Sequence, residues 1–278
     1  MPHFHKISKG GREKMEFFDS HCHLDDERFD EDRDKLIAEI KKADITKFVS
    51  AGYSVEGSIK GVALSKTYDY IYTTCGISPN DIPQNEEELW KDIEIIRDLV
   101  KENIKDKKIV AIGEIGLDYY WEKELQRKEL QRQVFIKQIE MANALNLPIV
   151  IHTREAVMDT LDILKKYTVN KKGVFHCCPL NRELVKEALK LGFYISFAGP
   201  ITFKNSKNAN EIIEIVPNDK ILIETDSPYL APEPVRGTRN DPRNVKYIAQ
   251  KIAEVKRVTL EDVAKMTYEN AKEIFGMK

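Results

Sequence analysis

The sequence has no long hydrophobic run and only four cysteines. No apolar stretch approaches the roughly 20 residues that a membrane-spanning helix needs, and the polar segment before Met15 lacks the apolar core of a secretory signal. The cysteines, Cys22, Cys75, Cys177 and Cys178, show neither disulfide nor zinc-ribbon spacing, which predicts free thiols in a reducing compartment. We therefore expect a cytoplasmic protein.

The chain also lacks a strong net charge. Its 44 Lys and Arg residues against 46 Asp and Glu residues leave a formal charge of −2, so no global basic field attracts nucleic acid or an anionic membrane. Contact with nucleic acid would therefore use a local patch. We expect no membrane contact, and we infer no obligate protein partner.

The chain does have enough apolar content for one large core. It has 278 residues, of which 42% are hydrophobic, and barrels of about 250 residues are routinely one domain. We find no linker, low-complexity tract or internal repeat. We predict one domain over residues 15–278. The leader, residues 1–14, is expected to be flexible, either as a native extension or as a remnant of cloning.

Short β-forming segments alternate with amphipathic segments along the chain. The predicted strands are Met15–Asp19, Thr46–Ala51, Tyr70–Gly76, Lys108–Glu114, Leu147–His152, Gly173–Cys177, Phe193–Gly199 and Lys220–Asp226. The predicted helices between them include Glu31–Ala43, Glu86–Asn103, Glu122–Leu145, Glu155–Tyr167 and Arg182–Lys190. Two further helical segments, Pro242–Glu254 and Thr259–Phe275, should close the bottom or side. This alternation favours parallel pairing through right-handed crossovers, and eight such units predict an α/β fold, the (β/α)8 TIM barrel.

Two histidine pairs share the same spacing but differ in context. His21 and His23 follow an apolar segment, and residues two apart in a strand point to the same face. Their rings can therefore share a metal ion, the alternative being two hydrogen-bonded histidines at a strand end. His3 and His5 have the same spacing in the polar leader with no strand before them, so there we predict a solvated tail.

The ends of the predicted strands carry a set of histidines and carboxylates. In a barrel the active site forms at the C-terminal ends of the strands. The residues predicted to meet there are His21, His23, Glu114, His152, His176 and Asp226. Imidazole suits zinc, manganese or iron, and a carboxylate can bridge two cations. We predict two divalent ions: one held by His21, His23 and Asp226, and one held by His152 and His176, with Glu114 shared between them.

Such a site is suited to hydrolysis. Two cations about 3.5–4 Å apart can activate a water between them, and Asp226 would accept the proton of that water. Asp19 and Glu224 are predicted to orient metal-bound histidines as hydrogen-bond acceptors. A non-catalytic structural metal is the alternative, but structural sites are usually closed four-ligand cages.

The loops that follow the strands carry cations with the right chemistry for phosphate. Arg154, Lys204, Arg236 and Arg239 all follow predicted strands, and the planar fork of arginine matches phosphate geometry. The alternative is ordinary surface charge, since 32% of the chain is charged. The aromatic residues of "DYYW", Asp118–Trp121, could stack on bases, although aromatic residues after a strand more often pack.

Six motifs resemble those of the TatD family of metal-dependent deoxyribonucleases, within the amidohydrolase-like barrels. They are "DSHCHLD", "AIGEIGLDYY", "PIVIHTREA", "FHC", "TFKN" and "ETDSPYLAPEPVRGTRN", and they cover nearly the whole chain after Met15 in the family's order. The resemblance implies the same six metal ligands. It also implies hydrolysis of phosphodiester bonds in DNA, often from the 3′ end, with Mg²⁺ or another divalent cation. We therefore expect a 3′–5′ exodeoxyribonuclease that contacts DNA through strand ends.

The sequence departs from the family in ways that bear on the substrate. The related cyclic-amide hydrolases carry a carboxylated lysine near the fourth strand, whereas this chain has "AIGE" there, so Glu114 takes its place. Ser78 stands where relatives usually have a histidine, and Cys178 and Pro179 replace the usual Phe-Ser. These changes leave the proposed ligands intact but alter the rim. Ester or amide hydrolysis, such as deacylation of a charged tRNA or opening of a cyclic amide, therefore remains the alternative activity.

Overall fold

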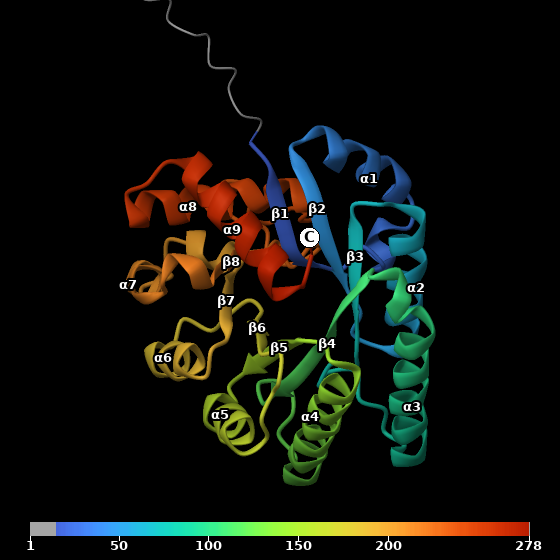
Figure 1. The fold of residues 1–278 in the computed structure, drawn as a ribbon. Helices are drawn as coiled ribbons and strands as arrows, with labels where there is room; N and C mark the ends of the chain where they lie inside the picture. The colour runs from blue at the N-terminus through green and yellow to red at the C-terminus, as the bar shows by residue number, and fades with distance from the viewer. Residues whose placement is uncertain (1–14, 278) are drawn as a thin grey trace, which may run out of the picture.

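The protein folds as a nearly closed ring of parallel strands surrounded by helices (Figure 1). The computed structural model describes residues 15–277, so the predicted solvated tail at His3 and His5 lies outside the described residues. One sheet contains eight strands in the sequential order β1 to β8, and every neighbouring pair is parallel. The predicted TIM barrel is therefore confirmed.

All eight strands lie where the sequence predicts them, although several ends differ. Their bounds are β1 Phe17–Cys22, β2 Ile45–Ala51, β3 Ile71–Cys75, β4 Ile109–Asp118, β5 Ile149–Arg154, β6 Gly173–Phe175, β7 Tyr194–Phe197 and β8 Ile221–Ile223. β4 continues past Glu114 to Asp118, and β8 ends before Asp226. Some proposed ligands thus lie within strands and others in the loops that follow them.

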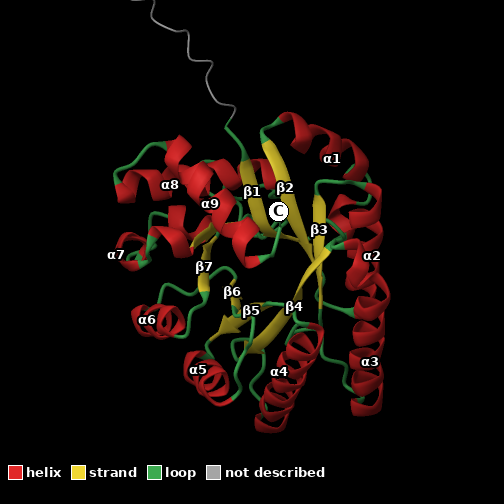
Figure 2. Cartoon of the chain, in the orientation of Figure 1, coloured by secondary structure: helices red, strands yellow, loops and turns green. Residues whose placement is uncertain are grey.

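The helices form the outer layer, drawn in red around the strands in Figure 2. Their bounds are α1 Arg33–Lys42, α2 Val55–Thr67, α3 Glu86–Asn103, α4 Leu125–Leu145, α5 Val157–Lys166, α6 Arg182–Lys190, α7 Ala209–Ile215, α8 Val245–Lys256 and α9 Leu260–Ile274. Short 3-10 helices lie at Glu27–Phe29, Ile104–Asp106, Gly199–Thr202, Asn218–Lys220 and Pro242–Asn244. The predicted segment Pro242–Glu254 thus begins as a 3-10 turn. α2 and α7 are additional to the helices named from the sequence.

The hydrophobic core has two parts. The larger part lies between the strands and the surrounding helices. The smaller part fills one end of the barrel interior, where Phe18, Val110 and Leu222 meet Ala271 and Phe275 from the end of the chain. The rings of Phe18 and Phe275 lie 6.2 Å apart. The last helix therefore closes the bottom of the barrel, as the sequence predicted, and leaves the opposite end for chemistry.

The contact between the first and last strands is made largely by the loop after β8. The Asp226 amide donates to the His21 carbonyl at 2.9 Å, and the His23 amide donates to the Ser227 carbonyl at 2.7 Å. The Ser20 hydroxyl donates to the Ile223 carbonyl at 2.9 Å. These bonds hold His21, His23 and Asp226 side by side at the open end of the barrel.

Across residues 15–277, none of the helices combines the length and apolar character that crossing a membrane requires. All four cysteines are free thiols, as predicted.

Candidate metal centre

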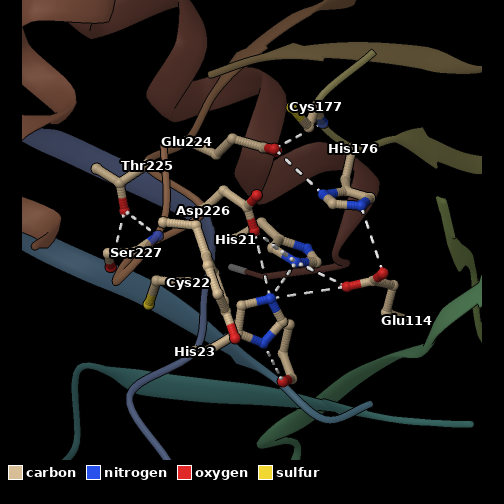
Figure 3. A network of polar contacts seen from close by, with 12 residues as sticks. His21, Cys22, His23, Glu114, His176, Cys177, Glu224, Thr225, Asp226 and Ser227 are labelled. Atoms are coloured by element: carbon tan, nitrogen blue, oxygen red, sulfur yellow. Dashed lines mark hydrogen bonds and ion pairs between the residues drawn. The ribbon is translucent and has the colours of Figure 1, made fainter. Parts of the chain in front are cut away.

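The first group of ligand atoms comes from β1, β4 and the loop after β8. The Nε2 atoms of His21 and His23 lie 3.3 Å apart. The Nε2 atom of His21 is 3.2 Å from Glu114 Oε2, and that of His23 is 3.3 Å from Asp226 Oδ1. Figure 3 shows these side chains pointing toward one another. Ligand atoms of His21, His23 and Glu114 lie close enough together for one metal ion.

The second group uses the other oxygen of the same carboxylate. Glu114 Oε1 lies 3.1 Å from His152 Nδ1 and 3.6 Å from His176 Nε2. The two histidine nitrogens are 3.2 Å apart, and these three residues form another group that fits one ion. Glu114 thus presents one oxygen to each group, which is the arrangement expected of a bridging carboxylate. The structure brings all six predicted residues together.

A glycine allows the two strands that carry the second group to approach closely. Gly116 pairs with His152 across β4 and β5. A Cβ atom at Gly116 would lie 2.0 Å from the His152 carbonyl oxygen, and its φ of 141° suits glycine. Any larger residue would push β5 away and separate His152 from Glu114.

The charges of the site favour a cation at its centre. Burial alone would raise the pKa of Glu114, but His176 and hydrogen bonds from neighbouring histidines hold it well below its usual value. Burial lowers the pKa of His23, but the hydrogen bond to Asp226 outweighs it and raises this pKa to about 9. Ionised carboxylates thus face the His23 ring, which carries a positive charge when no other cation is present. Imidazole and carboxylate together are a donor set that fits divalent metals.

Three of the histidines have an acceptor on the ring nitrogen that faces away from the other ligands. His23 Nδ1 lies 3.1 Å from the Ala51 carbonyl oxygen. His152 Nε2 lies 3.0 Å from Asp118 Oδ2, and His176 Nδ1 lies 3.3 Å from Glu224 Oε1. Such partners fix the tautomer and ring orientation of metal-binding histidines.

Asp118 is a residue of the site that the sequence analysis missed. It was considered only as part of an aromatic motif, because the predicted strand ended at Glu114, whereas β4 ends at Asp118. Besides its contact with His152, its Oδ1 accepts the amides of Tyr120 and Trp121 at 2.9 and 3.2 Å. It therefore links a proposed ligand to the rim.

Asp19 lies against the backbone beside the proposed ligands. Its carboxylate accepts the Thr225 amide at 3.0 Å, the Thr225 hydroxyl at 2.5 Å and the His21 amide at 3.3 Å. Burial raises the pKa of Asp19 well above its usual range despite these bonds. Asp19 thus holds the backbone on both sides of the ligands and does not contact a histidine ring.

A cavity of about 800 Å³ opens over the ligands. Its rim includes Ser78 and Pro179, two of the positions that depart from the family, whereas Cys178 is buried. Arg154 and Trp121 also line it. The departures at Ser78 and Pro179 therefore face the space that a substrate would occupy.

The predicted phosphate-binding cations divide into two sets. Arg154 lines the cavity, with its guanidinium carbon 3.8 Å from the centre of the Tyr120 ring. Arg239 does not line the cavity. Its guanidinium forms a bidentate ion pair with Asp32 at 2.8 and 2.6 Å. Arg236 and Lys204 are exposed and also lie outside the cavity lining, with Arg236 packed on Phe203 at 4.1 Å. The structure thus brings only Arg154 to the ligands.

A TIM barrel with two adjoining histidine and carboxylate groups at its open end defines a metal-dependent hydrolase. The model of the family described as "TatD related DNase" matches residues 18–276, and the chain belongs to that family. The chain is 42% identical over 261 residues to the metal-dependent hydrolase YabD of Bacillus subtilis, with 93% of this chain and 98% of YabD covered. It is 38% identical over 265 residues to the metal-dependent hydrolase YcfH of Escherichia coli K12, with 94% and 96% covered.

Solved structures agree with the fold. The crystal structure of YJJV, a TatD homologue from Escherichia coli K12, superposes with a TM-score of 0.88 over 96% of this chain and all of that one, at 23% identity. A TatD family hydrolase from Entamoeba histolytica superposes with a TM-score of 0.83, at 21% identity and with 94% and 98% covered. The barrel therefore has the same fold as these two solved structures.

Proposed function

We propose that this hydrolase cleaves phosphodiester bonds of DNA, as a 3′–5′ exodeoxyribonuclease that uses two divalent ions. The observation that carries the proposal is the position of Arg154, a cation at the rim of the cavity that holds the metal ligands. The family description names DNase activity. The direction from the 3′ end rests on the family resemblance alone.

The residues of the centre can be assigned roles in this reaction. His21, His23 and Asp226 would hold one ion, and His152 and His176 the other, with Glu114 between them. When bound, the ions would polarise the phosphate and supply a nucleophilic water at neutral pH. Asp226 lines the cavity beside His23, which supports assigning to its carboxylate the role of proton acceptor during hydrolysis.

The rim offers suitable groups to a nucleotide. Arg154 has no carboxylate partner within residues 15–277, and stacking on Tyr120 leaves the edge of its guanidinium free to donate to phosphate. Beside it, the Trp121 side chain is 67% exposed and lines the cavity. An exposed aromatic face next to an unpaired arginine suits a base and its phosphate. A small ester or cyclic amide would need neither group.

The test is incubation of Mg²⁺-, Mn²⁺- or Zn²⁺-loaded protein with end-labelled single- and double-stranded DNA, alongside a sample in excess chelator. We expect shortening from the 3′ end that the chelator abolishes. Arg154→Ala should raise KM for DNA by about tenfold, the value of a charge-assisted hydrogen bond. The matched control is Arg236→Ala, which removes an exposed arginine outside the cavity and should leave KM unchanged.

Two outcomes would refute the proposal. One is no cleavage of DNA with any of the three metals while the same protein hydrolyses a carboxylic ester or a cyclic amide. The other is that the Arg154→Ala and Arg236→Ala variants cleave DNA equally well. Arg154 would then have no part in binding the substrate.

A further inference from the structure

Two buried glutamines lie on helix α4, which packs against the outside of β4 (Figure 1). They are Gln131 and Gln138, and their spacing places them on the same face of the helix. A buried side-chain amide without hydrogen-bond partners is costly. The partners that these two amides find inside the protein therefore show what each residue holds in place.

Gln131 brackets the last residue of β4. Its Oε1 accepts the Asp118 amide at 2.9 Å, and its Nε2 donates to the Asp118 carbonyl oxygen at 3.2 Å. The same Nε2 donates to the Pro79 carbonyl oxygen at 3.2 Å, which joins the end of β4 to the loop after β3. The side-chain amide is thus fully used, and it fixes the backbone of Asp118 on both sides.

The carboxylate that projects from this backbone is also held at both oxygens. Oδ1 of Asp118 accepts the amides of Tyr120 and Trp121. Oδ2 accepts Asn80 Nδ2 at 3.2 Å and lies 3.0 Å from His152 Nε2. Asp118 is fully buried, so it has little freedom to adjust if its backbone moves. The position of the oxygen that faces His152 therefore depends on what holds the end of β4.

We propose that Gln131 is a positioning residue for His152 and acts through Asp118. The acceptor on the outer ring nitrogen orients a metal-binding histidine, and here a helix of the outer layer orients that acceptor in turn. His152 Nδ1 lies 3.1 Å from Glu114 Oε1, so a ring that follows a displaced Asp118 carries a proposed ligand atom with it. Helix α4 thereby sets the geometry of one ion, although none of its residues lines the cavity.

The inference rests on the ligand assignment made under the proposed function, and it does not depend on DNA being the substrate. Gln138 provides the matched comparison. Its Oε1 accepts the Ile77 amide at 2.8 Å, and its Nε2 donates to the Ile77 carbonyl oxygen at 2.9 Å. This is the same kind of bracket, but it holds Ile77 and not Asp118. Loss of either bracket leaves buried backbone groups without partners and should lower stability, whereas only the loss of Gln131 should reach a metal ligand.

The experiment compares Gln131→Met with Gln138→Met, because methionine is similar in size but has no amide. Metal-free protein is titrated with Mn²⁺ and Zn²⁺, and both dissociation constants are measured without DNA. A direct partner of a metal-binding histidine typically contributes about 10–100-fold to metal affinity, so a residue that acts through that partner should contribute less. We expect Gln131→Met to weaken one ion by about three- to tenfold and to spare the other. Gln138→Met should leave both constants unchanged, although denaturant unfolding should show a similar loss of stability in the two variants.

A spectroscopic measurement separates positioning from a general loss of packing. In the Zn²⁺-loaded wild-type protein, the His152 Nε2 proton that faces Asp118 should give an NMR signal that exchanges slowly with water. In Gln131→Met this signal should shift and exchange faster, and in Gln138→Met it should be retained. If Gln131→Met folds poorly, Gln131→Asn takes its place, because it keeps the amide but is too short to make the same bonds.

Wild-type affinity for both ions in a folded Gln131 variant, with the His152 signal unchanged, would overturn the inference. Equal weakening in Gln138→Met would also overturn it, because the effect would then follow from lost packing alone. Unchanged metal binding in His152→Ala would overturn the ligand assignment as well, so the two failures can be told apart. Failure to cleave DNA would bear on the proposed activity only, since the titration contains no DNA.

Discussion

At the scale of single residues, Glu114 is the point where the two ligand groups meet. Each of its oxygens faces a different pair of histidines. Its charge offsets the repulsion between two cations held on either side of it. Substitution of Glu114 therefore distinguishes a bridged pair of ions from two ions that bind independently.

The first prediction concerns Glu114→Gln, which keeps the shape of the side chain but removes its charge and one good oxygen ligand. Hydrolytic activity should fall at least about 10²-fold, on the order of 3 kcal/mol in the transition state. We expect close to two ions per chain in the wild-type protein, and elemental analysis should show fewer in this variant. Glu155→Gln, an exposed rim glutamate paired with Lys123 at 3.4 Å, is the control and should change neither. Normal metal content with a near-normal rate in Glu114→Gln would refute the bridge.

The six proposed ligands were found from the sequence because strand ends in a barrel share one rim, so position along the chain translated into position in space. Rim cations were not predictable in the same way. Arg239 lies on a loop next to a proposed ligand, but its partner Asp32 is 207 residues away in the chain, and no local pattern reveals such a pair. Asp118 was missed because its motif was considered only for the stacking of the aromatic residues that follow it.

At the scale of elements, the fourth strand is the clearest difference from expectation. The predicted strand ends at Glu114, whereas β4 continues through Gly116 to Asp118. The glycine is needed for close packing on β5, which a sequence pattern cannot distinguish from a turn. Helix α2 was not among the helices named from the sequence, and it contains Gly57 and Gly61, which are weak helix formers. The strands themselves were predictable because buried parallel strands form nearly continuous apolar runs.

The bottom of the barrel gives the second prediction. Phe275 follows the last helix, is 6% exposed and packs against Phe18 in the barrel interior. Phe275→Ala should lower the free energy of unfolding by about 3 kcal/mol, through lost burial and the cavity left behind. Denaturant unfolding would measure this. Metal content should remain normal, because the ligands lie at the opposite end of the barrel.

The control for this prediction is Leu125→Ala, whose side chain is 82% exposed and should change stability little. Loss of metal together with stability in Phe275→Ala would contradict the separation of the two ends. An unfolding free energy equal to the wild-type value would show that the last helix does not seal the barrel.

At the scale of the whole molecule, metal binding and stability are linked. The ligands come from strands and loops spread over the chain, from His21 to Asp226, so an ion that holds them joins the first strand to the last. An ion that binds only the folded chain stabilises it, by about 2.7 kcal/mol at a concentration 100 times its dissociation constant. The metal-free protein should therefore melt at a lower temperature than the loaded protein.

The last prediction is that this stabilisation grows with pH. In the metal-free protein burial lowers the pKa of His23, but Asp226 outweighs it and raises the pKa to about 9. The imidazolium therefore contributes stability that is fully present below the usual pKa of about 6.5 and is lost as pH rises through 9. A metal requires the neutral ring, so binding below pH 9 expels a proton, and affinity should rise by up to about tenfold per pH unit for one proton expelled. Melting curves with and without Zn²⁺ should differ more at pH 8.5 than at pH 7.

Calorimetric titrations in two buffers of different ionisation enthalpy count the protons released. At pH 7 we expect at least one proton per chain, because His23 is protonated before the metal enters. The His176 pKa points the same way: burial lowers it, but Glu114 and Glu224 raise it well above the usual value. Zero proton release at pH 7, with equal stabilisation at both pH values, would mean that His23 is already neutral when the metal arrives. A positive charge other than the His23 imidazolium would then balance the carboxylates of the site.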